Sequence, residues 1–313
     1  MSVSNGKASL RVVMFTVSPF YIPIAEDLLR QKGHRLVGVV SAPGPRTRRT
    51  DDYLEVGQYA RPGRDVIISN YPNRWAAMIR PLKPDLLYCL SFNWTIPAEV
   101  LQVPRLGAIN VHDALLPKYR GRNATGWALR NDEPELGMTV HFMTPELDNG
   151  PILSQRRVPI SDADLNLETI YQRFAGVANE GILEALERVA AGDPGTPQDE
   201  TQVTHAGGAF EPEWREIDWG RTAREIFVQV RSWYGARDVP LGAFGEIEGR
   251  RMLITKTKLV DESPSGLAPG SVIRTDPDGI LIQCADRPLL VVAAEPVAPE
   301  LDELLPAEPA YPS

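Results

Sequence analysis

Three polar side chains near the middle of the chain have the types that acyl transfer to an amine needs. Asn110 and His112 stand two residues apart at the end of a strand-like run, GAINVH, and alternate residues of a strand share a face. Asp148 follows in a Leu-Asp-Asn-Gly-Pro turn, where a loop could place it beside them. Asn supplies an amide donor, His exchanges a proton near neutral pH, and Asp supplies a fixed charge. These groups could stabilise an oxyanion, move the amine proton and orient the imidazole.

The same spacing also fits a purely structural alternative. A histidine at a strand end can be hydrogen-bonded within the fold, and Asp-Asn-Gly is an ordinary turn sequence. Ligands of open parallel sheets collect at the carboxyl ends of strands, which favours a site at this position. Motifs elsewhere in the chain are needed to choose between the structural and the catalytic interpretation.

Three further side chains are rival nucleophiles with weaker support: Ser18, Cys89 and Ser91. No G-x-S-x-G elbow surrounds either serine. Cys89 stands in an apolar run and is predicted to be a small buried hydrophobic residue. The run TVSPFY after the first strand-like segment lacks G-x-G-x-x-G, which disfavours a dinucleotide site.

The other histidines are predicted to lie outside the chemistry. His34 follows a helix end and is expected at the surface, and His205 stands in a linker-like stretch without an obvious partner. His141 alternates with Thr139 and Met143 on a strand-like run, and we interpret it as structural, although it could approach an acceptor. The histidines show no metal spacing such as H-E-x-x-H, so no metal is expected.

The composition is that of a globular protein of the cytoplasm. The 313 residues are 43% hydrophobic and 24% charged, and the net charge is −8. This charge argues against broad adhesion to nucleic acid or to an anionic membrane, although a local basic patch could exist. No run approaches the ~20 apolar residues of a membrane span, and the N-terminus lacks a signal-peptide pattern. The two cysteines, Cys89 and Cys284, indicate a reducing compartment without a disulfide framework.

The elements that must position these groups alternate between strand-like and helix-like runs over the first half. The strand-like runs are 10–15, 35–41, 65–69, 85–92 and 107–112, followed by the run MTVHFMT. This alternation predicts a Rossmann-like α/β fold, a mostly parallel sheet with flanking helices, which forms a catalytic domain over 1–191. The chain's 28 prolines predict many loops rather than long helices.

The composition changes after residue 191. Residues 192–213 are rich in Gly, Pro, Thr and acidic residues, as in a linker. A helical pattern with Ile226, Phe227 and Val230 on one face precedes several short strand-like runs. These runs predict a smaller C-terminal β-barrel domain, OB-like, over 214–298. The acidic, proline-rich tail 299–313 is expected to be flexible.

Several motifs in order resemble the signature of the folate-dependent formyltransferases. They are the Asn110-x-His112 pair, LLPKYRG from Leu115 to Gly121, and LDNGPIL from Leu147 to Leu153. The resemblance extends to PDLLYCLSFNWTIP, to IDW and to PLGAF, and so covers most of the chain. The family includes methionyl-tRNA formyltransferase, glycinamide ribonucleotide formyltransferase and sugar N-formyltransferases.

The resemblance implies formyl-tetrahydrofolate as co-substrate, no metal, and direct attack of the amine on the formyl carbon. His112 would stabilise the oxyanion and assist proton movement. Asn110 would donate a hydrogen bond to the formyl oxygen. Asp148 would hold the histidine charged and orient a water or the amine. Positioning is then the main contribution of the protein.

The resemblance also implies where the two ligands bind. The folate would contact Tyr88, Cys89, Leu90, Ser91, Phe92, Asn93, Met143, Thr144, Glu146 and Leu147. The acceptor would contact Leu116, Pro117, Tyr119, Arg120, Arg122, Asn123 and Trp127. Pterin edges are commonly read by main-chain groups, so side-chain identity in the first set carries little information. Loop solvation is the alternative for Arg120 and Arg122.

A small amine is the preferred acceptor, such as an amino sugar, a nucleotide-linked amine or a biosynthetic intermediate. A tRNA enzyme must neutralise phosphates, yet Arg46, Arg48 and Arg49 are diluted by prolines and aspartates, and the linker is acidic until Arg215. The tRNA enzymes also commonly continue LLPKYRG with Gly-Ala-Ala-Pro-Ile, whereas this chain has Arg-Asn-Ala-Thr-Gly.

Methionyl-tRNA as acceptor is therefore the disfavoured alternative, and a non-catalytic folate- or nucleic-acid-binding relative is a second one. Such a relative should have lost one of Asn110, His112 or Asp148, and all three are present. No membrane partner is expected, and a homodimer is possible.

Overall fold

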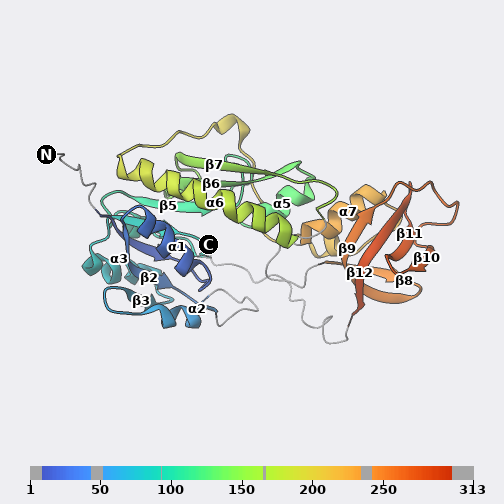
Figure 1. The fold of residues 1–313 in the computed structure, drawn as a ribbon, viewed down its shortest axis with the longest axis horizontal. Helices are drawn as coiled ribbons and strands as arrows, with labels where there is room; N and C mark the ends of the chain where they lie inside the picture. The colour runs from blue at the N-terminus through green and yellow to red at the C-terminus, as the bar shows by residue number, and fades with distance from the viewer. Residues whose placement is uncertain (1–8, 44–51, 93, 165–166, 234–241, 298–313) are drawn as a thin grey trace. The chain divides into compact units, whose positions relative to one another are not determined.

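The computed structural model describes residues 9–43, 52–92, 94–164, 167–233 and 242–297 (Figure 1). The chain folds into two compact units, each assembled from three stretches. The first unit contains 1–120, 137–157 and 175–204, and the second contains 121–136, 158–174 and 205–313. The chain therefore passes back and forth between the units instead of completing one before the other begins.

A seven-stranded sheet, in the order β3-β2-β1-β4-β5-β6-β7, is the framework of the α/β part. Its strands are β1 Arg11–Phe15, β2 Arg35–Ser41, β3 Asp65–Ile68, β4 Leu86–Cys89, β5 Ala108–His112, β6 Glu135–Phe142 and β7 Ile152–Pro159. The strands β3, β2, β1, β4 and β5 pair in parallel, whereas β6 runs antiparallel to β5. The predicted mostly parallel sheet is confirmed.

The central strands are buried on both faces, which explains their continuous apolar sequences. In β1 every residue after the first is buried, and in β4 all are buried. Helix α3, Pro72–Ile79, covers one face, and the ring of Trp75 lies edge-on to that of Phe15 with centroids 5.8 Å apart. The indole N–H of Trp75 donates to the carbonyl of Ser69 at 3.0 Å, so the buried ring leaves no donor unsatisfied.

Helix α6, Leu167–Ala190, is 24 residues long and packs on β6 and β7 through a glycine. A Cβ at Gly181 would lie 2.7 Å from the side chain of Met138. The Ser154 hydroxyl donates to the Gly181 carbonyl at 2.7 Å. The expectation that the many prolines exclude long helices is wrong here, because the prolines all fall outside this segment.

The remaining helices are shorter. They are α1 Tyr21–Gln31, α2 Asp52–Glu55, η1 Val56–Tyr59, η2 Arg80–Leu82, α4 Ala98–Leu101, α5 Ala124–Arg130, η3 Glu200–Gln202, η4 Pro212–Arg215 and α7 Ala223–Ser232. Helix α1 buries Ile22, Ala25, Leu28 and Leu29, an amphipathic pattern. Among the helices of the described part of the chain, none has the length and apolar character to cross a membrane.

A five-stranded antiparallel sheet dominates the second unit, in the order β10-β11-β12-β9-β8. Its strands are β8 Ala243–Ile247, β9 Arg250–Leu259, β10 Val272–Asp276, β11 Gly279–Gln283 and β12 Pro288–Pro296. Helix α7 contributes Ile226, Phe227 and Val230 to the core that this sheet covers. The prediction of a smaller β domain after the α/β domain is confirmed.

His34 is buried and not at the surface as the sequence led us to expect. It is 6% exposed, and its Nδ1 accepts a hydrogen bond from the main-chain N–H of Leu10 at 3.4 Å. The start of β2 lies against the start of β1 here, since the N–H of Arg35 donates to the carbonyl of Leu10. The predicted flexible tail 299–313 lies outside the described residues.

Helix α7 begins with a capping box whose removal gives a first prediction. The Thr222 hydroxyl accepts from the N–H of Glu225 at 3.3 Å, and the Glu225 carboxylate accepts from the N–H of Thr222 at 2.9 Å. Thr222→Ala should lower the free energy of unfolding in urea by about 1 kcal/mol. Thr222→Ser keeps the hydroxyl and should cost much less. Equal losses in both variants would show that this hydroxyl does not stabilise the helix.

Candidate active site

Strand β5 carries Asn110 and His112 and extends past its parallel neighbour. Strand β4 ends at Cys89, which stands opposite Asn110 in the register. On the other side, antiparallel β6 places His141 opposite Asn110 and Thr139 opposite His112. Side chains in such a register share one face of the sheet, so the polar groups of two strands point to the same side.

Asp148 completes the cluster, as its position after the next strand predicted. One carboxylate oxygen lies 3.6 Å from Nδ1 of His112, and the other lies 3.5 Å from Nε2 of His141 and 3.4 Å from the amide nitrogen of Asn110. Asp148 is 9% exposed and His112 is 7% exposed. A carboxylate this buried requires donors or positive charge around it. The structure therefore brings the three predicted catalytic residues together and adds His141.

The backbone of the turn determines where the Asp148 carboxylate lies. Asp148 has φ 51°, in the left-handed region that Asp and Asn enter more readily than other side chains. A Cβ at Gly150 would collide with the carbonyl oxygen of Phe142, so glycine is needed there. The N–H of Phe142 donates to the carbonyl of Pro151 at 2.9 Å. The turn is thus fixed to the end of β6.

The two ring nitrogens of His112 face two different acceptors. Its Nε2 lies 2.8 Å from the carbonyl oxygen of Tyr119, which can only accept, so Nε2 carries a proton. Its Nδ1 lies 3.6 Å from a carboxylate oxygen of Asp148. The ring is therefore held between a main-chain carbonyl and a buried carboxylate.

The ring nitrogens of His141 also have different partners. Its Nδ1 lies 2.7 Å from the carbonyl oxygen of Phe142 and therefore donates. In the neutral ring Nε2 is then an acceptor, and the amide nitrogen of Asn110 lies 3.3 Å from it. His141 thus orients the Asn110 amide. Our interpretation of His141 as structural missed this contact, although its alternation with Thr139 on the strand was the available signal.

Two predicted folate contacts, Tyr88 and Cys89, have side chains that point into the core. Both are buried, Cys89 among the apolar residues of the face that α3 covers. Burial raises the pKa of the Cys89 thiol to about 12, and the charge of Asp148 adds to this effect. Burial also raises the pKa of the Tyr88 phenol. Near neutral pH both side chains are uncharged, and these residues could offer a ligand only their main-chain groups.

The other predicted folate contacts follow the ends of β4 and β6. Leu90, Ser91, Phe92, Met143 and Thr144 are half-buried, Glu146 and Leu147 are exposed, and Asn93 lies outside the described residues. The N–H of Met143 donates to the carbonyl of Ala108 at 2.8 Å, which holds this segment against β5. Partly exposed apolar side chains beside main-chain groups fit a flat heterocycle with polar edges.

Part of the predicted acceptor set lies in the first unit and already has partners within the protein. Leu116 is buried, and its carbonyl accepts a hydrogen bond from the Gln155 side chain. The carbonyl of Pro117 accepts one from the main-chain N–H of Thr204. Tyr119 gives its carbonyl to His112, and the Arg120 guanidinium binds Gln198 and Glu200.

The rest of the acceptor set lies in the second unit: Arg122, Asn123 and Trp127. The Asn123 amide and the Trp127 indole both donate to the carbonyl of Gly208, at 3.1 and 2.9 Å. The Trp127 ring packs edge-on to Phe210 with centroids 5.3 Å apart. These contacts attach α5 to residues 208–210, which belong to the same unit.

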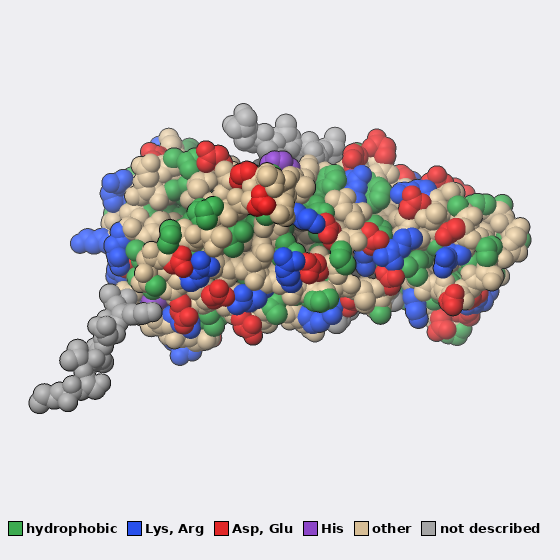
Figure 2. All heavy atoms as spheres, turned by 90° about the horizontal axis from the view of Figure 1, so that it is seen from above, with side chains coloured by type: hydrophobic (Ala, Val, Ile, Leu, Met, Phe, Trp, Pro, Cys, Tyr) green, Lys and Arg blue, Asp and Glu red, His purple; other side chains and the backbone are tan. Residues whose placement is uncertain are grey.

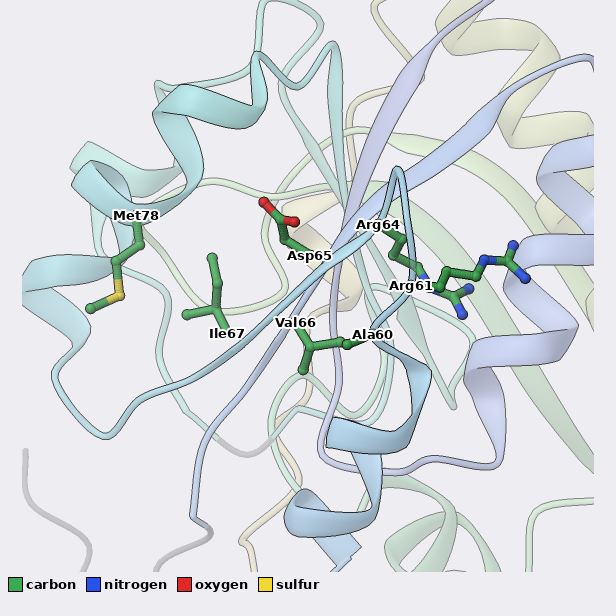
Figure 3. A pocket seen from close by; sticks show the side chains of 7 residues that line it. All are labelled: Ala60, Arg61, Arg64, Asp65, Val66, Ile67 and Met78. Carbon is green, nitrogen blue, oxygen red and sulfur yellow. The ribbon is translucent and has the colours of Figure 1, made fainter.

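A hollow at the edge strand β3 is remote from this chemistry (Figure 3). Its volume is about 730 Å³, and Arg61, Arg64 and Met78 are among its lining residues. Both arginines form ion pairs with Glu26. Three strands of the sheet separate β3 from β5, so the hollow does not contain the polar cluster. Within the described residues there is also no group of three or more His, Cys, Asp and Glu arranged to hold a metal.

The buried state of both cysteines gives a second prediction. Cys89 and Cys284 are buried, and burial raises the pKa of each thiol to about 12. The thiolate is the reactive form, so native protein at pH 8 should react with Ellman's reagent much more slowly than protein unfolded in urea. Cys89→Ala should leave the remaining thiol equally protected. Rapid labelling of native protein that Cys89→Ala abolishes would contradict the buried assignment and reopen the case for a nucleophile.

Comparison with known proteins assigns the family. Residues 34–186 match the formyl transferase family, and residues 210–298 match the formyl transferase C-terminal domain. The methionyl-tRNA formyltransferase of Lactiplantibacillus plantarum is 31% identical over 294 residues, which cover 90% of this chain and 89% of that protein.

Solved structures share the fold at lower identity. HypX from Aquifex aeolicus in complex with tetrahydrofolic acid has a TM-score of 0.61 at 21% identity, over 92% of this chain and 44% of that one. An N-formyltransferase from Helicobacter canadensis, in complex with folinic acid and dTDP-3-aminofucose, has a TM-score of 0.62 at 16% identity, over 92% and 100%. Together with the two domain matches and the sequence relative, this establishes that the chain belongs to the folate-dependent formyltransferase family, the enzyme family its motifs resembled.

Proposed function

We propose that the chain transfers a formyl group from formyl-tetrahydrofolate to an amine by direct attack, with Asn110, His112 and Asp148 as its catalytic residues. The observation that carries the proposal is the buried Asp148 carboxylate between the imidazoles of His112 and His141, next to the Asn110 amide. Such a cluster supplies positive charge, an amide donor and a proton acceptor within one small volume.

The His112 imidazolium would stabilise the negative charge that develops on the formyl oxygen as the C–N bond forms. Its Nδ1 lies 3.6 Å from Asp148, too far for a short hydrogen bond, so this N–H is available to an oxyanion. The C–N bond to the folate breaks as the tetrahedral intermediate collapses, so the amine must lose a proton and the folate nitrogen must gain one. Asp148 would accept the proton of the amine, directly or through a water, and pass it to the folate nitrogen. The Asn110 amide nitrogen lies 3.3 Å from Nε2 of His141 and 3.4 Å from Asp148, and it would turn the N–H that faces Asp148 to the formyl oxygen.

For the acceptor, we now favour methionyl-tRNA over the small amine that the sequence led us to prefer. The support is the curated relative at 31% identity, which covers about nine-tenths of both chains and is a methionyl-tRNA formyltransferase. Several further relatives at about 30% identity carry the same name. The basic loop residues Arg46, Arg48 and Arg49, on which a tRNA contact could depend, lie outside the described residues.

A small amine remains the second candidate because of the charge distribution. On the face in Figure 2 the described Lys and Arg side chains are interspersed with Asp and Glu and do not form a continuous basic surface. The net charge of −8 acts in the same direction. The Helicobacter canadensis structure with an amino sugar nucleotide has the same fold.

Substitution of the cluster gives the third prediction. His112→Ala and Asp148→Asn should each lower kcat at least about 100-fold, because each removes charge or proton transfer at the reacting centre. Binding of tetrahydrofolate should change little. Transfer is followed by the absorbance of the folate product, with a reaction that lacks protein as the control for spontaneous deformylation. Full activity of both variants would refute the catalytic assignment.

The acceptor is identified in the same assay. Charged initiator tRNA and a panel of amino sugars and nucleotide-linked amines are offered separately, and the tRNA reaction is repeated at rising salt. Turnover with tRNA that weakens steeply as salt rises would support the first candidate. Turnover with a small amine and none with tRNA would establish the second. Light scattering of the same preparation determines whether the protein is a homodimer.

A further inference from the structure

The two partners of His112 lie on separate loops, and one side chain from the predicted linker joins them. The carbonyl of Tyr119 belongs to the LLPKYRG loop, whereas Asp148 belongs to the turn after β6. Gln198 lies in the segment 192–213, to which the sequence assigned no role in the site. Gln198 contacts both loops through its terminal amide. The three segments all belong to the first unit.

The Gln198 amide uses all of its hydrogen-bonding capacity in these contacts. Its nitrogen donates to the carbonyls of Asp148 and Gly150, each at 2.8 Å. Its oxygen accepts from Nε and Nη2 of Arg120, at 3.1 and 2.8 Å. A carboxamide has two donors and two acceptor lone pairs, so all four are occupied. We name this set of four hydrogen bonds the Gln198 bridge.

Arg120 is held firmly enough to serve as an anchor for the bridge. Its residue is 6% exposed, and its guanidinium forms a two-point ion pair with Glu200, at 2.7 and 3.2 Å. The hydrogen bond from Arg120 lowers the pKa of the Glu200 carboxyl, so the pair stays ionised near neutral pH. A planar guanidinium bound on two edges has little freedom to move. Four of the five N–H groups of Arg120 are used in these bonds.

Thr204 fixes the other side of the same loop. Its hydroxyl accepts from the N–H of Tyr119 at 2.9 Å, and its carbonyl accepts from the N–H of Arg120 at 2.9 Å. Its own N–H donates to the carbonyl of Pro117 at 3.3 Å. These bonds hold Tyr119 in the left-handed region, with φ 59°, and thereby direct its carbonyl at His112.

We propose that Gln198 is a positioning residue, which sets the distance between His112 and Asp148 by joining the Asp148 turn to Arg120. Gln198 touches neither imidazole, and it acts through the two backbones. The inference rests on the proposed function, in which His112 and Asp148 are catalytic. It also reassigns Arg120 from an acceptor contact to an anchor of the site.

The first test is kinetic and uses a matched control. Gln198→Met keeps the volume but removes all four hydrogen bonds, and it should lower kcat at least tenfold while the KM values for folate and acceptor change less than threefold. Gln198→Glu can still accept from Arg120 but cannot donate to the two carbonyls, so it should be equally slow. Gln202→Met is the control, because among the described residues the Gln202 amide binds the exposed side chain of Asp199, within the same segment. In a His112→Ala background, Gln198→Met should cause no further loss.

The second test does not require turnover. The ring-proton signals of His112 are followed by NMR in the full chain, and they are identified by their loss in His112→Ala. The groups that face the ring are Asp148 from the turn, His141 from β6 and the Tyr119 carbonyl. If Gln198→Met moves Asp148 away from the ring, the surroundings of the ring change, and these signals should shift. Gln202→Met should leave them unchanged.

The outcomes separate this inference from the proposed function. Absence of turnover with every acceptor would refute the proposed function, and the ring-proton signals of His112 would still decide the role of Gln198. Unchanged His112 signals in Gln198→Met, or full activity in Gln198→Glu, would overturn the inference. A large rise in KM at constant kcat would also overturn it, because it would make Gln198 a residue of the binding surface. The melting temperature of each variant verifies that these comparisons are made on folded protein.

Discussion

The burial of one carboxylate constrains the whole site. Asp148 is nearly excluded from water, so its charge must be balanced by the donors around it, the His112 imidazole and the Asn110 amide. Each of these groups is oriented in turn by a main-chain carbonyl or by another side chain: His112 by Tyr119, and Asn110 by His141. Two features of the fold place this charge. They are the antiparallel pairing of β6 with β5 and the glycine-dependent turn that follows β6.

The segment between the two family domains belongs to the site as much as the strands do. Its composition, rich in proline and acidic residues, is that of a connector, yet Gln198, Glu200 and Thr204 bind the loops that carry the partners of His112. The acidic character of this segment argues against tRNA binding, but one of its carboxylates has a local partner. Glu200 neutralises the buried Arg120.

The sequence predicts the fold well and the site partly. Short apolar runs separated by segments of helical periodicity identify the strands β1 to β5, because burial of both faces of a sheet requires continuous apolar sequence. Short strand-like runs identify the later β domain in the same way. The pair Asn110 and His112 and the turn at Asp148 are found by motif. The place of His141 could not be derived, since it depends on the antiparallel register of β6 with β5. The role assigned to Gln198 and the partners of Arg120 depend on contacts about 50 to 80 residues apart in the chain, which no local pattern encodes.

These long-range contacts also determine when the site can form during synthesis. Asn110, His112 and Asp148 are all translated well before Gln198 and Thr204, so a growing chain possesses the reactive groups before it possesses the segment that joins their loops. A ribosome-bound chain that ends before Gln198 therefore contains the reactive groups but lacks the segment that joins the loops beside His112.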